Sequence, residues 1–157
     1  MDKEAKRDYW ELLDKLVDCE QGSEREFAIY QELVEISDAE IKATEEEAKA
    51  DVFDPQTGKL LSEQPIFLDD FAAPMDNLAR IYIDREEFDK ALPLLEKALP
   101  IYRTLEIRNA KYTYQRYYAT KAMIDCLRKV GKDTLAVLYE FELKHLRRDV
   151  LKDDNID

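Results

Sequence analysis

Few side chains in this sequence are placed to do chemistry. The single histidine, His145, is followed by Leu146 and two arginines. Its imidazole could act as a general base, but a lone surface histidine is more often incidental. The three consecutive carboxylates at 45–47 would point to successive faces of a helix, so they cannot converge on a metal ion. The residues therefore predict no catalytic site, no metal site and no cofactor, and we expect that the chain is not an enzyme.

Glycine and cysteine usage argues against two common kinds of site. The chain has three glycines, too few for a phosphate-binding loop, and the stretch 131–134 lacks the upstream glycine that such a loop needs. The two cysteines, Cys19 and Cys126, have no CxxC spacing, so they indicate neither a zinc site nor a redox pair. Phosphate-loop chemistry and thiol redox chemistry are therefore not expected.

One local feature runs against the charge of the whole chain. Residues 102–121 contain five basic residues, one acidic residue and five tyrosines. Tyrosine and arginine are favoured interface anchors, so this stretch is a candidate surface for an acidic group or a terminal carboxylate of a partner. The alternative is that the tyrosines pack between helices and the charges stay in solvent, because the basic residues do not share one helix face.

The elements that must position these residues are helices. Three glycines and five prolines give the chain few breakers, and apolar residues recur at spacings of three and four. We predict an all-α protein that forms a single helical domain over 1–157. Its expected parts are an N-terminal helix pair at 4–50, a loop insertion at 51–69, a best-formed repeat at 70–107, and a degenerate repeat with a cap at 110–152.

Local signals mark several helix ends. Ser23, followed three residues later by Glu26, predicts a capping box at the start of the second helix. Gly131 predicts the end of another helix. Pro93 and Pro100 fall inside a helical pattern, and either they bend the helix or the helix stops near Pro100.

Apolar stripes predict the buried faces of the first and last helices. In the first helix the stripe consists of Tyr9, Leu13, Leu16 and Val17. In the last helix it consists of Leu135, Leu138, Tyr139, Leu143, Leu146 and Val150. Each set recurs at helical spacing, so we expect both to face the core.

The formal net charge of −12 at pH 7 limits the classes of partner. A nucleic-acid-binding protein needs a basic surface, and so does a protein that lies on an anionic membrane, so we expect neither partner. A basic protein partner is compatible with this charge. The first ten residues are charged without an apolar core, and no run of 18 apolar residues occurs, so we expect a cytoplasmic protein.

Residues 77–99, NLARIYIDREEFDKALPLLEKAL, have the pattern of a helix–turn–helix unit. Small residues that permit close helix approach are interleaved with bulky ones at Met75, Leu78, Ala79, Tyr82, Phe88, Ala91, Leu95 and Ala98. This spacing resembles the tetratricopeptide repeat, and Asn77 before the Leu-Ala pair resembles the repeats of kinesin light chain. A poorer match follows at 117–150. Its Ala136 lies 45 residues after the equivalent Ala91 of the better repeat, instead of the usual 34 or so.

The resemblance implies antiparallel helix pairs in a right-handed array of about three hairpins, which binds another protein or a peptide on its concave face. In that family the first helix of each pair lines this face. The implied contact residues are Asn77, Arg80 and Asp84 in the better repeat and Tyr118, Lys121, Asp125 and Arg128 in the poorer one. Two alternatives accompany the scaffold reading: a small acidic chaperone or immunity protein dedicated to a secreted effector, and a homo-oligomer formed through exposed end faces.

Overall fold

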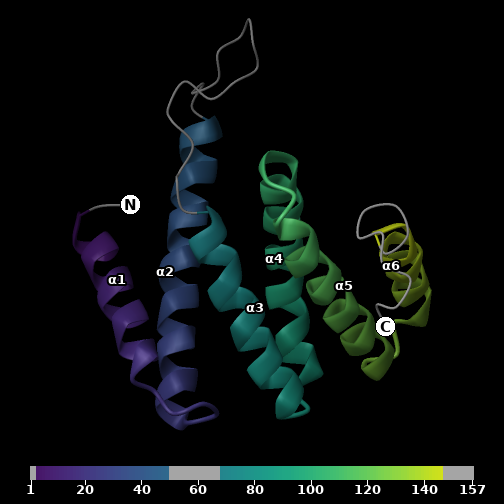
Figure 1. Cartoon of the computed structure of the whole chain (residues 1–157), viewed down its shortest axis with the longest axis horizontal. Coiled ribbons are helices and arrows are strands. Elements are labelled where there is room, and N and C mark those ends of the chain that lie inside the picture. Colours follow the sequence, from purple (N-terminus) through teal and green to yellow (C-terminus); the bar gives the residue numbers. More distant parts are fainter. Residues whose placement is uncertain (1–2, 50–67, 147–157) are drawn as a thin grey trace, which may run out of the picture. The chain divides into compact units, whose positions relative to one another are not determined.

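The computed structural model describes residues 3–49 and 68–146, and the regular structure of these residues is entirely helical (Figure 1). The helices are α1 (Lys3–Val17), α2 (Glu24–Lys49), α3 (Leu68–Asp84), α4 (Phe88–Arg108), α5 (Tyr112–Lys129) and α6 (Asp133–His145). The all-α prediction is confirmed for this part of the chain, in which α1 packs on α2 and the helices α3 to α6 each pack on the next. Predictions that fall on 50–67 and 147–157, including most of the loop insertion, lie outside the described residues.

The chain divides into two compact units, which we describe separately. One unit, Met1–Phe67, contains α1 and α2, and the other, Leu68–Asp157, contains α3 to α6. That both belong to one domain stays a prediction.

In the first unit, α1 packs on α2 through apolar residues from both helices. The buried ones are Tyr9 and Leu12 of α1 and Ile29, Leu33 and Val34 of α2. At the start of α2 the hydroxyl of Ser23 accepts a hydrogen bond from the N–H of Glu26 at 3.2 Å. The carboxylate of Glu26 accepts one from the N–H of Gly22, also at 3.2 Å. The predicted cap at Ser23 is therefore confirmed, with the carboxylate reaching one residue further back than in a standard capping box.

In the second unit, α3 and α4 form a hairpin whose close packing depends on alanine. Ala79, Ala91 and Ala98 are fully buried. Without side-chain bulk at these positions, the two helices can approach until larger side chains interlock around the contact. Those larger buried side chains are Phe71, Met75, Leu78, Leu95 and Leu99. The sequence motif thus corresponds to the packing of the hairpin.

The two hairpins of this unit use the same turn geometry. Glu86 has a positive φ of 59°, and the N–H of Glu87 donates to the carbonyl of Tyr82 at 2.8 Å. Gly131 has a φ of 80°, and the N–H of Lys132 donates to the carbonyl of Leu127 at 2.8 Å. Both are helix ends of the Schellman type, so the predicted helix end at Gly131 is confirmed. The equivalent turns lie 45 residues apart because α4, with 21 residues, is long for a repeat helix.

Helix α4 continues through both of its internal prolines to Arg108. The alternative that the helix stops near Pro100 is therefore wrong. Pro93 and Pro100 are both exposed on α4, where solvent can reach the carbonyl groups that lack a proline N–H partner. An internal proline is more tolerable at such a position than at a buried one.

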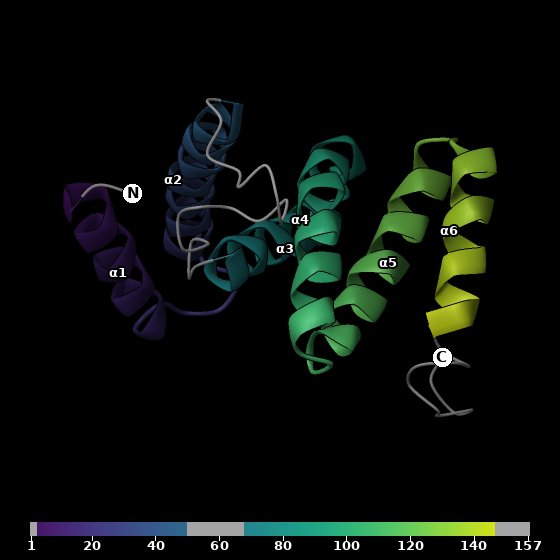
Figure 2. The same cartoon turned by 90° about the horizontal axis from the view of Figure 1, so that it is seen from above.

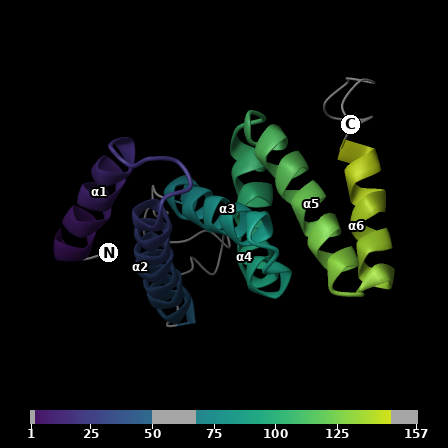
Figure 3. The same ribbon diagram turned by 90° about the horizontal axis from the view of Figure 1, so that it is seen from below.

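Some predicted core residues at the ends of the described chain are exposed. Val17 is 83% exposed at the last position of α1, and Leu138 is 62% exposed on α6. Leu135 is also exposed, whereas Leu146 is buried as predicted. Figures 2 and 3 show the reason for α6, which packs against α5 along one side only. Periodicity locates an apolar stripe, but a helix at the end of a packed series has fewer neighbours to cover it.

An ionic network joins α6 to both α4 and α5. The carboxylate of Glu142 accepts two hydrogen bonds of 2.8 Å from Nη2 of Arg103 and one of 2.9 Å from Nη2 of Arg116. Arg116 also donates to Glu106 at 3.0 Å. Burial by itself would raise the pKa of Glu142, but hydrogen bonds from Arg116 and Arg103 and their charges outweigh it, so the pKa is lowered.

Candidate functional site

A pocket of about 360 Å³ opens between α3 and α5, the first helices of the two hairpins in the second unit. Its wall from α3 consists of Arg80, Ile83 and Asp84, and its wall from α5 consists of Tyr118, Lys121, Ala122 and Asp125. Within each helix these positions are three or four residues apart, which places them on one face. The pocket therefore combines charged, aromatic and aliphatic side chains from two rigid elements.

Five of the seven predicted contact residues line this pocket: Arg80, Asp84, Tyr118, Lys121 and Asp125. Asn77 is exposed one turn before Arg80 on α3 and is not part of the lining. Arg128 is also outside the lining, and its guanidinium is held by Glu140 and Asp133. The structure thus brings together most of the predicted face and leaves its two outermost members aside.

The positive charge of Arg80 is already matched inside the protein. Its Nε lies 3.2 Å from Oδ1 of Asp76, one turn earlier on α3. Asp76 is buried, and its other oxygen accepts a 3.1 Å hydrogen bond from the hydroxyl of Tyr102 on α4. Burial raises the pKa of Asp76, although Arg80 and Tyr102 both act to lower it. The spacing of i and i+4 between Asp76 and Arg80 is the sequence signal from which this pair could have been predicted.

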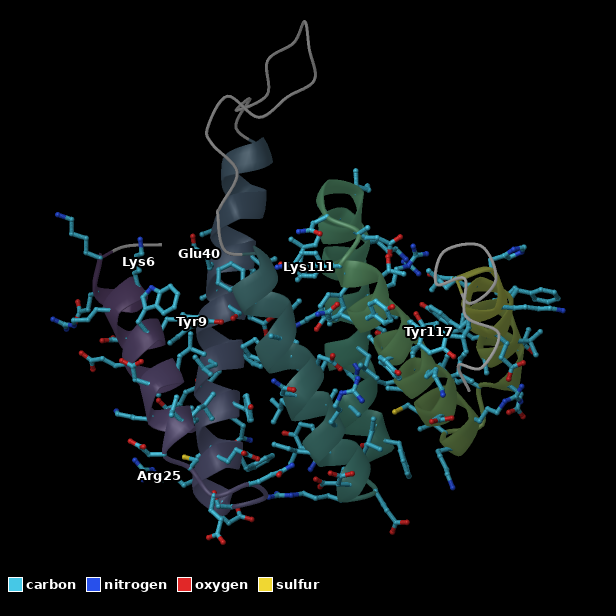
Figure 4. All side chains as sticks on the ribbon, viewed as in Figure 1. Lys6, Tyr9, Arg25, Glu40, Lys111 and Tyr117 are labelled. Carbon is cyan, nitrogen blue, oxygen red and sulfur yellow. The ribbon has the colours of Figure 1, made fainter. Side chains whose placement is uncertain are left out.

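The α5 wall contains two adjacent tyrosines with different roles. Tyr117 is buried in the core on α5 (Figure 4), and Nζ of Lys121 lies 5.7 Å from the centroid of its ring. Tyr118 is 48% exposed, and its ring meets that of Tyr117 edge-on, with centroids 5.2 Å apart at an interplanar angle of 86°. The buried ring therefore supports the exposed one, so the pocket has an aromatic wall of defined orientation.

Asp84 and Asp125 are the uncompensated negative charges of the pocket. Both are exposed, and among the residues that the structure describes neither carboxylate has a hydrogen bond or an ion pair. Burial in the first place, and the charge of Asp125 in the second, raise the pKa of the neighbouring Cys126 thiol to about 11. That thiol is therefore protonated at neutral pH and is not a nucleophile.

The basic and aromatic stretch 102–121 is divided by the fold. Tyr102, Tyr112 and Tyr117 are buried between helices, whereas Tyr114 and Tyr118 are exposed. Arg103 and Arg116 are engaged by the carboxylate of Glu142. Packing thus accounts for three of the five tyrosines, and the stretch does not form one continuous basic surface.

Other candidate chemistry lies apart from the pocket. His145 is exposed at the end of α6 and is not among the lining residues. Within residues 3–49 and 68–146, no group of three His, Cys, Asp or Glu side chains is arranged to hold a metal ion. None of the helices described has the length and apolar character that crossing a bilayer requires.

Comparison with known proteins gives one match. Residues 72–106, which cover α3 from its fifth residue and nearly all of α4, match the family model of the tetratricopeptide repeat. No curated protein and no solved structure matched the chain. The finer likeness to kinesin light chain stays a prediction. The matched segment coincides with the alanine-packed hairpin, so the hairpin of α3 and α4 is similar to a tetratricopeptide repeat.

Proposed function

We propose that this protein is a non-enzymatic scaffold that binds another protein or a peptide on the face formed by α3 and α5. The repeat identified at residues 72–106 belongs to a class of helical modules that mediate protein interactions. Such modules stack helix pairs, and the first helices of successive pairs present a shared surface. In this chain α3 and α5 occupy those positions.

The observation that carries the proposal is the pocket itself. Its seven lining residues come from the first helix of each hairpin, and most are polar or charged groups placed on rigid helices. Concave sites with an apolar wall and a few convergent polar groups are typical ligand-binding features. An adaptor and a dedicated chaperone would both use such a face, and the identity of the bound protein separates them.

A photo-crosslinking experiment tests the face. The photoreactive residue p-benzoylphenylalanine is introduced in place of Tyr118, and in a second variant in place of Trp10 on α1. The two aromatic side chains are matched in exposure, at 48% and 44%. Each variant is expressed in its native cells and irradiated, and adducts are identified by mass spectrometry.

We expect a discrete protein adduct at position 118 that is absent at position 10. Absence of any adduct at 118, or the same set of adducts at both positions, would show that the α3–α5 face is not the binding surface. Circular dichroism of both purified variants establishes that each is folded.

A further inference from the structure

We propose that the α3–α5 pocket selects an arginine side chain of the bound protein, with the guanidinium facing Asp84 and Asp125 and lying against the ring of Tyr118. This inference rests on the proposed function, because it names the group that the binding face recognises. It reverses the expectation from the stretch 102–121, which pointed to an acidic ligand.

The charges of the pocket carry the first step. Arg80 contributes little net positive potential, because Asp76 lies 3.2 Å behind its guanidinium. The remaining charged groups are the carboxylates of Asp84 and Asp125 and the ammonium of Lys121. Two negative groups against one positive group leave the pocket negative, so it favours a cationic ligand.

Arg128 supports the same conclusion from outside the pocket. The family resemblance places Arg128 among the expected contact residues of the binding face. In the structure it contacts Glu140 and Asp133, so its charge is matched within the protein. Arg80 and Arg128, the two arginines among the predicted contact residues, are therefore both already paired within the protein.

The shape and lining of the pocket favour arginine among cations. The exposed ring of Tyr118 offers a face for a planar guanidinium, and Ile83 and Ala122 offer apolar contact to a methylene stem. A guanidinium carries five donors in a fixed fork, which suits two carboxylates from different helices better than a compact ammonium does. The volume of about 360 Å³ is near the lower end for ligand sites, as expected for one long side chain.

The net charge of −12 would assist the approach of such a partner. A negative field attracts a basic segment before contact and accelerates association at low ionic strength. The pocket then supplies the local selectivity. An acidic side chain would face two carboxylates with Lys121 alone to hold it, and it should be rejected.

The experiment is a two-dimensional ¹H–¹⁵N NMR titration of the full chain with three small probes. The first probe is N-acetyl-arginine-N-methylamide. The second is the corresponding citrulline derivative, which is isosteric but uncharged, and the third is the corresponding glutamate derivative. We expect the arginine probe to shift amide signals of residues 80–84 and 118–125 in a saturable manner. The citrulline and glutamate probes should bind at least about tenfold more weakly, because citrulline has no positive charge to pair with the carboxylates and glutamate is repelled by them.

The double variant Asp84→Asn/Asp125→Asn should raise the Kd of the arginine probe by about tenfold or more. A matched control, Asp89→Asn/Glu96→Gln, changes the net charge by the same amount at two exposed positions on α4 and should leave the Kd within about twofold. Equal effects of the two double variants would mean that general charge, and not the pocket, holds the probe. In titrations of the unaltered protein, the inference would be overturned if the glutamate probe bound more tightly than the arginine probe. Equal affinities for the citrulline and arginine probes would also overturn it.

Crosslinking at position 118 separates this inference from the proposed function. If Asp84→Asn/Asp125→Asn captures the same partner as the parent, the arginine inference is wrong while the scaffold proposal stands. If the arginine probe binds as expected but no adduct forms at 118, the pocket chemistry holds and the proposed function fails.

Discussion

The substitution Glu142→Gln tests whether the ionic network stabilises the docking of α6 on α4 and α5. Glutamine keeps the size of the side chain, but it removes the charge and turns one acceptor into a donor. Arg103 and Arg116 would then face an amide in place of a carboxylate that accepts three hydrogen bonds shorter than 3 Å. Arg116 would keep only Glu106 among its present partners in the described part of the chain.

The expected loss in the free energy of unfolding lies between the values known for exposed and for buried ion pairs. Exposed pairs contribute about 0–1 kcal/mol, and breaking a fully buried pair costs about 3–5 kcal/mol. The side chains of Glu142 and Arg116 are 23% and 20% exposed, and that of Arg103 is 40% exposed. We therefore expect the free energy of unfolding of the second unit to fall by about 2 kcal/mol, and its thermal midpoint to fall by roughly 8–16 °C.

Urea unfolding followed by far-UV circular dichroism measures this change. The single tryptophan, Trp10, lies in the first unit, so its fluorescence does not report on α6. Glu140→Gln is the matched control. It removes a carboxylate from the same helix, and the ion-pair partner of that carboxylate, Arg128, is exposed. The control should lose clearly less stability than Glu142→Gln.

The pH dependence gives a second readout of the same network. The pKa of Glu142 is lowered in the folded protein, so its contribution is complete above the ordinary value of 4.5 and is lost as pH falls through the folded pKa. The parent and Glu142→Gln should therefore converge in stability on acidification below about pH 4.5. A loss under about 0.5 kcal/mol at pH 7, or equal losses in both variants, would refute the reasoning.

Two further predictions concern the interior of the second unit. Burial raises the pKa of Asp76, so its ionisation opposes folding, and stability is lost as pH rises from 3.8 through the folded pKa. Asp76→Asn should therefore gain stability relative to the parent between pH 4 and pH 7 in urea titrations, and a relative loss would contradict this sign. Ala98→Leu places a large side chain where a fully buried alanine permits helix contact, and we expect a loss of about 1–3 kcal/mol by thermal unfolding. Ala73→Leu, at an exposed position of α3, should leave stability nearly unchanged. Similar losses of stability in both variants would show that close approach of α3 and α4 does not depend on Ala98.

Local rules predicted the helices well because helix formation depends on neighbouring residues. The Ser23 cap and the Gly131 helix end follow from hydrogen bonds and backbone angles within a few residues. The alanine pattern of α3 and α4 was readable for the same reason, since three-to-four spacing fixes which residues share a face. The contact positions implied by the tetratricopeptide resemblance then included five of the seven residues that line the pocket.

Burial at the ends of the described chain could not be predicted in the same way. Leu138 and Leu146 belong to one apolar stripe of the sequence, yet the first is 62% exposed and the second is buried. Periodicity says which residues lie together, and only the position of α5 says which of them are covered. Val17 differs from prediction because it is the last residue of its helix.

The sequence by itself determined the helical class, the turn chemistry and the repeat at 72–106, since each depends on residues close together along the chain. The charge that the candidate pocket presents was decided by the tertiary structure. Arg128 is matched by Glu140, twelve residues away on the next helix, and Tyr102 reaches Asp76 from another helix. Electrostatic pairing acts through space at a few ångströms, so folding decides which of several similar charges stay available to a ligand. In this protein those are the carboxylates of Asp84 and Asp125 together with Lys121.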